Sequence, residues 1–150
     1  MVEKLQNVFV NVEKGFMLNK QNVHRTLLIL CKKFDLTVKS LEINFVSSDT
    51  ILAVNKKFLK HDYYTDIITF DYSNERNNLD GEIFISVPEA KKNSKIFRVS
   101  VDNELLRLIV HGILHLIGYD DLETGKRKVM KKMENQLVKE FQKYDRGITK

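Results

Sequence analysis

The segment from Ser100 to Gly118 constrains the fold of this 150-residue chain more than any other. Ser100 can cap a helix, and Asp102 and Glu104 then fall in its first turn, where acidic side chains are favourable. Leucine and isoleucine between residues 105 and 117 cover every side of that helix, and Gly118 can end it. A helix without a polar face is normally buried, so we expect the other elements to pack around this one.

Shorter patterns predict the elements around the central helix. Strands are expected at residues 7–13, 41–46, 66–70 and 82–87, and helices at 20–34, from Ser48 or Asp49 to about Phe58, from Pro88 onward, and at about 123–143. This order is not a regular βαβ repeat. The expected class is therefore α+β, with a three-layer, α/β-like arrangement in which helices flank a mixed sheet.

The last predicted helix is amphipathic and basic. Its apolar stripe is formed by Met130, Met133, Leu137, Phe141 and Tyr144, and Lys128, Lys131, Lys132 and Lys139 lie off the stripe. The net charge of +5 comes from this end, because residues 1–122 hold 16 basic and 16 acidic side chains whereas residues 123–150 hold 9 and 4. Such a face attracts a polyanion such as RNA, although lysine-rich helix faces also occur where only solvent is contacted.

Length and cysteine content set further expectations. The length predicts one domain that spans residues 1–150. The first residues contain no long apolar run, so we expect neither a signal peptide nor contact with a membrane. Cys31 is the single cysteine and lies in line with Leu27 and Leu30, so we interpret it as a core residue. A chain without a disulfide is typical of a reducing location, here the cytoplasm.

The run His111-Gly-Ile-Leu-His115-Leu-Ile-Gly118-Tyr-Asp-Asp121 carries the candidate chemistry. Helix positions four apart lie above one another, so two imidazoles can bind one metal ion. After Gly118 the chain can turn back and bring Asp121 or Asp120 in as a third ligand. Three protein ligands leave a coordination position open, as metal catalysis requires. A histidine in an apolar helix can also be a core residue, but two buried rings need polar partners.

Gly112 stands where zinc peptidases of the His-Glu-x-x-His type carry the glutamate that serves as general base. Glycine cannot move a proton, so peptide hydrolysis is disfavoured. A glycine inside a helix also costs about 1 kcal/mol relative to alanine, which suggests a compensating role. One hypothesis is that it leaves room for a bulky substrate beside the metal. Gly112→Glu would then keep metal binding and lose activity.

The string HGILHLIGYDD resembles the motif HGxLHLxGYDH of the YbeY family of bacterial rRNA maturation endoribonucleases, in which three histidines bind zinc. Residues 55–70 are similar to a family segment that ends in Thr-Asp-Val-Leu-Ser-Phe, and residues 79–86 to its Gly-Asp-Ile-x-Ile-Ser strand. Met130 and Glu134 match a Met and a Glu of its C-terminal helix. The similarity covers roughly residues 50–135 in the family's order.

The resemblance implies a metal-dependent, single-strand-specific endoribonuclease that acts in late 16S rRNA 3′ end maturation and ribosome quality control. It implies one divalent metal ion, with Zn²⁺ expected, held by His111, His115 and Asp121 in a zincin-like fold with the metal-binding helix at its centre. The expected partners are rRNA and the ribosomal small subunit or its proteins. Beyond a metal-bound water, the sequence identifies no catalytic residue.

Two positions depart from the family pattern. Asp121 stands in the place of the third histidine, and a carboxylate reduces the positive charge of the site and widens the range of metals that fit it. Leu59 stands where the family has an arginine that is a candidate for contacting substrate phosphate. Lys60 and His61 are nearby and are the predicted substrate-binding residues, unless they are simply solvated loop residues.

Two other functions stay open from the sequence. The first is a non-catalytic, metal-containing ribosome-assembly factor that binds rRNA or a ribosomal protein. An open coordination position argues against it, and the two departures argue for it. The second is a small metalloprotease, which Gly112 disfavours.

Overall fold

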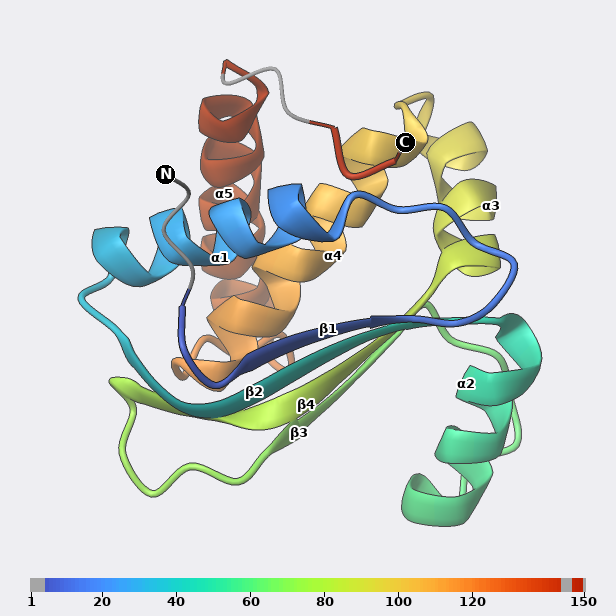
Figure 1. The fold of residues 1–150 in the computed structure, drawn as a ribbon, viewed down its shortest axis with the longest axis horizontal. Helices are drawn as coiled ribbons and strands as arrows, with labels where there is room; N and C mark the ends of the chain where they lie inside the picture. Colours follow the sequence, from blue (N-terminus) through green and yellow to red (C-terminus); the bar gives the residue numbers. More distant parts are fainter. Residues whose placement is uncertain (1–4, 144–146, 150) are drawn as a thin grey trace.

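A mixed sheet is the frame on which the other elements lie (Figure 1). The computed structural model describes residues 5–143 and 147–149, and in this part of the chain the sheet has four strands in the order β1-β2-β4-β3. β1 (Val8–Val12), β2 (Thr37–Val46) and β4 (Asn78–Ser86) are parallel. β3 (Ile67–Asp71) pairs antiparallel with β4 and is an edge strand, so the predicted mixed sheet is confirmed.

Helices cover both faces of the sheet. One face carries α1 (Lys20–Lys33), α3 (Val87–Phe97), α4 (Val101–Leu116) and α5 (Thr124–Gln142). The other face carries α2 (Ser48–Val54), which continues into a π-helical turn, η1 (Asn55–Leu59). The arrangement is therefore α+β with three layers, as predicted. The zincin-like character stays a prediction.

α4 is the central helix of the fold. Ten of its 16 residues are buried, which confirms the expectation from its apolar sequence. The main core lies between the sheet and the helices above it, where Ile109 and Ile113 of α4 meet Ile83 and Ile85 of β4 in one buried cluster. A smaller cluster on the other face, built on Val46, Ile51 and Ile68, holds α2. The first of these clusters fixes the height of α4 above the sheet.

The start of α2 differs from the prediction. Ser47 is the N-cap, rather than Ser48 or Asp49, because its side-chain oxygen accepts a hydrogen bond from the Thr50 N–H at 3.2 Å. The Glu13 carboxylate, just after β1, accepts from the Ser47 N–H at 2.6 Å and from the Thr50 hydroxyl. The Thr50 bond, against the smaller opposing effect of burial and helped by Ser47, holds the pKa of Glu13 below its usual value. A carboxylate at this helix end is favourable.

For other predicted element bounds, the structure corrects two strand starts, confirms one helix end and does not describe one residue of the last helix. β2 and β4 begin at Thr37 and Asn78, several residues before the predicted positions 41 and 82, because their polar first halves pair with each other. The helix after β2 continues through the π-helical turn η1 to Leu59, so its predicted end at about Phe58 is confirmed. On α5, Met130, Leu137 and Phe141 are buried and Met133 is partly buried, whereas Tyr144 lies outside the described residues.

Residues 147–149 return to the beginnings of the helices α1 and α4. The Asn19 N–H donates to the Ile148 carbonyl at 2.7 Å, and Leu18 and Thr149 form an isolated antiparallel bridge. The Thr149 N–H donates to the Asp102 carboxylate at 2.6 Å, at the start of α4. Residues beyond α5 therefore join the first turns of α1 and α4. Among the described residues, none of the helices has both the length and the apolar content that a membrane crossing requires.

Candidate metal centre

A cavity of about 660 Å³ lies between α4 and the edge strand β3. Its wall on α4 includes Arg107, His111 and His115, which recur every four residues and so share one face of the helix. Its other lining residues are Thr65, Asp66, Ile67, Thr69, Asp71, Phe97, Glu104, Leu108, Asp121 and Glu134. Both histidines therefore face an open space beside the sheet rather than the core.

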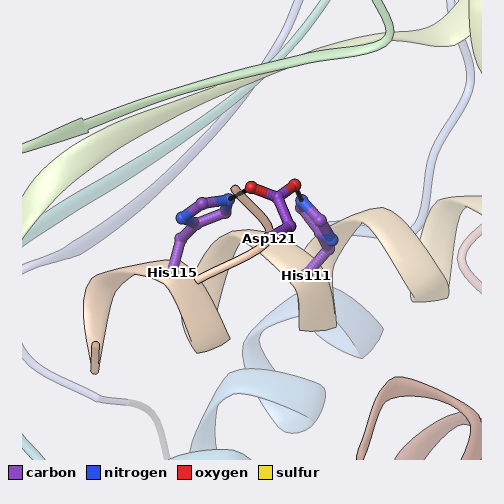
Figure 2. Close-up of side chains that lie close together, drawn as sticks. All are labelled: His111, His115 and Asp121. Carbon is purple, nitrogen blue, oxygen red and sulfur yellow. Dashed lines mark ion pairs between the residues drawn. The ribbon is translucent and has the colours of Figure 1, made fainter. Parts of the chain in front are cut away.

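Asp121 faces the two histidines across this space (Figure 2). Its carboxylate oxygens lie 3.7 Å from His111 Nε2 and 3.5 Å from His115 Nε2. Metal bonds of about 2.0–2.2 Å at tetrahedral angles would separate two ligand atoms by about 3.4 Å. The three predicted residues are thus brought together, with their ligand atoms within 4.8 Å of one another, and the set fits a divalent metal ion.

The turn after α4 determines which aspartate joins the histidines. Gly118 has φ +102°, a left-handed conformation that side chains rarely adopt, and its N–H donates to the His115 carbonyl at 3.1 Å. The chain then reverses and places Asp121 beside the rings. Asp120 instead accepts a hydrogen bond from the Leu122 N–H at 2.7 Å and so stabilises the turn. Of the two carboxylates left open by the sequence, the structure brings Asp121 to the histidines.

Glu134 of α5 contacts the other nitrogen of His111. Its carboxylate lies 2.8 Å from Nδ1, and a protonated Nδ1 donates to it, which leaves the Nε2 lone pair directed at Asp121. Burial acts to lower the pKa of His111, whereas the hydrogen bond with Glu134 and the charge of that carboxylate raise it. The charges of Asp121 and Asp66 act in the same direction, so the pKa of His111 lies above its usual value. Glu134 is therefore a positioning residue for a metal ligand.

Further acidic groups surround the cavity and one arginine lies among them. Arg107 lies 3.8 Å from both Glu104 and Glu134, and its Nη1 donates to Asn135 at 2.7 Å. Glu104 is 2% exposed, and its Oε1 makes no hydrogen bond within the described structure. Burial raises the pKa of Glu104 against the lowering effect of Arg107, and the nearby Asp66 raises it further. The cavity therefore combines a candidate cation site with an acidic wall.

Gly112 does not serve the role we hypothesised from the sequence. A Cβ atom at this position would lie 2.8 Å from Cδ1 of Ile83 and 3.4 Å from Cδ1 of Ile67, so it would point into the core and not into the cavity. The missing side chain lets α4 approach the sheet closely, and it makes no room for a substrate. Gly112→Glu would therefore place a carboxylate between helix and sheet, and we now expect it to disturb the metal site rather than to keep it.

Lys60 and His61 lie outside the cavity lining. Lys60 caps the end of η1 with φ 56°, and the ring of His61 stacks on Tyr63 with a centroid distance of 5.1 Å. Tyr63 OH also lies 3.0 Å from His61 Nδ1. Both predicted residues are exposed, in a segment that leads along the chain to Thr65 and Asp66 at the cavity wall. Their contact with a substrate stays a prediction.

Sequence reasoning did not assign roles to Glu134 and Arg107. Glu134 matched the family pattern, but its contact with His111 depends on how α5 packs against α4. A signal was present, because Glu134 lies at helical spacing between Met130 and Leu137 on the apolar stripe, where an acidic residue needs a partner. Arg107 interrupts the apolar run of α4 and gave a similar signal.

The fold and the site together define a class: an α+β protein with two histidines and one carboxylate that can hold a metal ion at an open cavity. A family model described as endoribonuclease YbeY matches residues 8–142, and the chain belongs to this family. The family predicted from HGILHLIGYDD is confirmed, and with it the prediction of an endoribonuclease. The alternative of a non-catalytic assembly factor is not favoured by this match.

Individual relatives agree with the family match. The chain is 50% identical over 94 residues to a protein named endoribonuclease YbeY from Bacteroides fragilis, a match that covers 63% of this chain and 67% of the relative. It is 38% identical over 128 residues to the protein of the same name from Cytophaga hutchinsonii, with 85% and 90% covered. A solution structure from Thermotoga maritima superposes with a TM-score of 0.66 at 32% identity, over 89% of this chain and 87% of that one.

Proposed function

We propose that this protein is a metal-dependent endoribonuclease that cleaves single-stranded RNA during late maturation of the 16S rRNA 3′ end and in ribosome quality control. The observation that carries the proposal is the convergence of His111, His115 and Asp121 at an open cavity in a chain of this family. The cleavage would act on rRNA in the cytoplasm, within or beside the ribosomal small subunit. Residues 1–150 would form one domain.

His111, His115 and Asp121 would hold the metal ion, and Zn²⁺ is the ion that we propose. A divalent metal at this position supplies a Lewis acid that polarises a phosphoryl oxygen and lowers the pKa of water. Glu134 keeps the Nδ1 proton of His111 and so directs Nε2 toward the site. One carboxylate in place of a third histidine leaves the site with one positive charge, and Mn²⁺ or Fe²⁺ are the alternatives that this donor set admits.

Lys60 and His61 are the proposed contacts for RNA on the approach from η1. They belong to an exposed segment in which Lys57 lies over the ring of Phe58 at 5.2 Å and His61 stacks on Tyr63. Phe58 and Tyr63 are 59% and 55% exposed, which is unusual for rings of this size. Exposed aromatic rings beside cations suit a single strand, because bases stack on the rings and phosphates meet the charges.

The test is cleavage of a labelled single-stranded fragment from the 3′ end of 16S rRNA by metal-loaded protein, with His115→Ala run beside it. Cleavage that is lost in the variant supports the proposal, and equal cleavage by both proteins would point to a contaminating nuclease. Metal content of both proteins is measured in the same preparations. Wild-type protein that is loaded with metal, binds the fragment and leaves it intact would contradict the proposed function.

A further inference from the structure

Unpaired positive charge gathers on one face of α5, beside the metal centre. Arg127, Lys128, Lys131 and Lys132, which we call the α5 basic face, line a second groove of about 500 Å³ together with Asn135 and Gln136. The four cationic side chains are exposed. The three lysines form no ion pair with any residue that the structure describes. The charges are therefore available to a ligand.

The α5 basic face adjoins the metal centre at two points. Nη1 of Arg107, which lines the metal cavity, donates to Asn135 of the second groove at 2.7 Å. Nε of Arg127 donates to the carbonyl oxygen of Asp121 at 3.0 Å. Residues that line the metal cavity thus contact residues that line the basic groove, and a bound strand can pass from one to the other.

Charge favours a path of RNA from the metal centre toward α5 over a path toward β3. The wall of the cavity on the β3 side carries Asp66 and Asp71, and carboxylates there repel phosphates. Of the described residues that line the cavity, Arg107 is the one with a permanent positive charge. A polyanion that occupies the metal centre is therefore attracted toward Arg107 and the α5 basic face.

Arg107 is held in a fixed orientation with part of its guanidinium available. Its Nη1 is hydrogen-bonded to Asn135, and its ion-pair distances of 3.8 Å to Glu104 and Glu134 are longer than hydrogen bonds. Nη2 makes no hydrogen bond within the described part of the chain, and the side chain is 25% exposed. Arginine in this situation is suited to binding a phosphate through two parallel N–H donors.

We propose that single-stranded RNA leaves the metal centre over Arg107, which binds the phosphate next to the cleaved one, and continues along the α5 basic face. The inference rests on the proposed function and adds the path and direction of the substrate. Four residues of helix place Arg107 about 6 Å from His111 along the axis of α4, which is one helical turn. Arg107 is thus close enough to the metal site to bind a neighbouring phosphate.

The first experiment compares two triple variants that remove the same charge. Lys128→Gln/Lys131→Gln/Lys132→Gln neutralises the α5 basic face, and Lys91→Gln/Lys92→Gln/Lys95→Gln neutralises three exposed lysines of α3. Both are made in the His115→Ala background, so that RNA stays intact. Binding of a labelled single-stranded RNA is measured by fluorescence anisotropy at several salt concentrations.

The slope of log affinity against log salt concentration should become shallower by about 2 when three phosphate contacts are lost. Each contact contributes about 0.7 to this slope for a single strand. We expect this change, and at least about a tenfold weaker affinity at low salt, for the α5 triple variant. The α3 triple variant should keep the slope of the parent. Equal slopes for the two triple variants would overturn the inference. That result would also be expected if the α5 basic face bound an acidic protein instead of RNA.

The second experiment tests direct contact by Arg107. RNAs that carry one neutral methylphosphonate linkage at successive positions are bound to the His115→Ala parent and to the same protein with Arg107→Gln. We expect one linkage, beside the cleavage site, whose neutralisation weakens binding of the parent about tenfold and leaves binding of the arginine variant unchanged. If Arg107 acted only through Glu104 and Glu134, the same linkage would weaken both proteins equally, and the inference would be overturned.

These results are separable from failure of the proposed function. Wild-type protein that neither binds nor cleaves RNA would contradict the proposed function itself, and the path with it. Wild-type protein that cleaves RNA while both triple variants bind alike would contradict only the path.

Discussion

Gly112→Ala tests whether this glycine sets the distance between α4 and the sheet. Alanine is favoured over glycine in a helix by about 1 kcal/mol. Its Cβ, however, would lie 2.8 Å from Cδ1 of the fully buried Ile83, where carbon atoms prefer about 3.5–4.0 Å. Overpacking of a core by one methyl group costs about 1–3 kcal/mol. We expect a net loss of about 1 kcal/mol in the free energy of unfolding.

The cause of that loss is tested in a double-mutant cycle with Ile83→Val, which deletes Cδ1, the nearer of the two Ile83 methyl groups that the new Cβ would meet. Ile83→Val alone should cost about 0.5–1.5 kcal/mol. In its presence Gly112→Ala should become neutral or stabilising, so the two changes should show a favourable coupling of about 1–2 kcal/mol. The assay is equilibrium unfolding in urea with a chelator present, so that metal binding does not contribute to stability.

Gly125→Ala on α5 is the matched control, because a Cβ at Gly125 meets no atom within 4 Å. It should be neutral or stabilise the protein by up to about 1 kcal/mol, since only helix propensity changes. Gly112→Ala that stabilises the protein as much as this control, or that adds to Ile83→Val without coupling, would refute the argument from close packing.

Three further predictions concern the metal centre and the core. Glu134→Gln should weaken metal binding about tenfold or more, because the acceptor of the His111 Nδ1 proton loses its charge. A competitive chelator titration measures the affinity, and Glu140→Gln elsewhere on α5 is the control. Gly118→Ala should cost about 1 kcal/mol or more in urea unfolding, because φ is +102° there, and unchanged stability would contradict the role of the turn. Burial raises the pKa of Cys31 to about 11. Iodoacetamide at pH 8.5 should therefore alkylate the folded protein at least about 50-fold more slowly than the urea-unfolded protein. Comparable rates would disprove burial of the thiol.

The parts of the fold with strong periodicity were predictable from the sequence. The all-round apolar pattern of α4 and the stripe on α5 each require a particular burial, and both are found. The first halves of β2 and β4 were missed, because Lys39, Asp80 and Gly81 interrupt the alternation that a half-buried strand shows. The strand order β1-β2-β4-β3 depends on which parallel partners pack best, and no local pattern encodes that choice.

The candidate site was predictable where its residues are neighbours in sequence. The helix period and the glycine stop bring His111, His115 and Asp121 together within 11 residues. The contact of Glu134 with His111 joins two helices across 23 residues, so it required the packing of α5 on α4. The role of Gly112 was misjudged for the same reason, since only the position of β4 shows which way its missing side chain would point.

The return of residues 147–149 to α1 and α4 has a consequence for the order in which the fold is completed during synthesis. A ribosome synthesises the chain from its N-terminus, so the two histidines emerge before Glu134, and Glu134 emerges before the residues that bind Asn19 and Asp102. A nascent chain that stops short of these last contacts lacks the support for its metal-binding helix. The metal-binding helix therefore gains the contact of Thr149 with Asp102 only after residue 149 has left the ribosome.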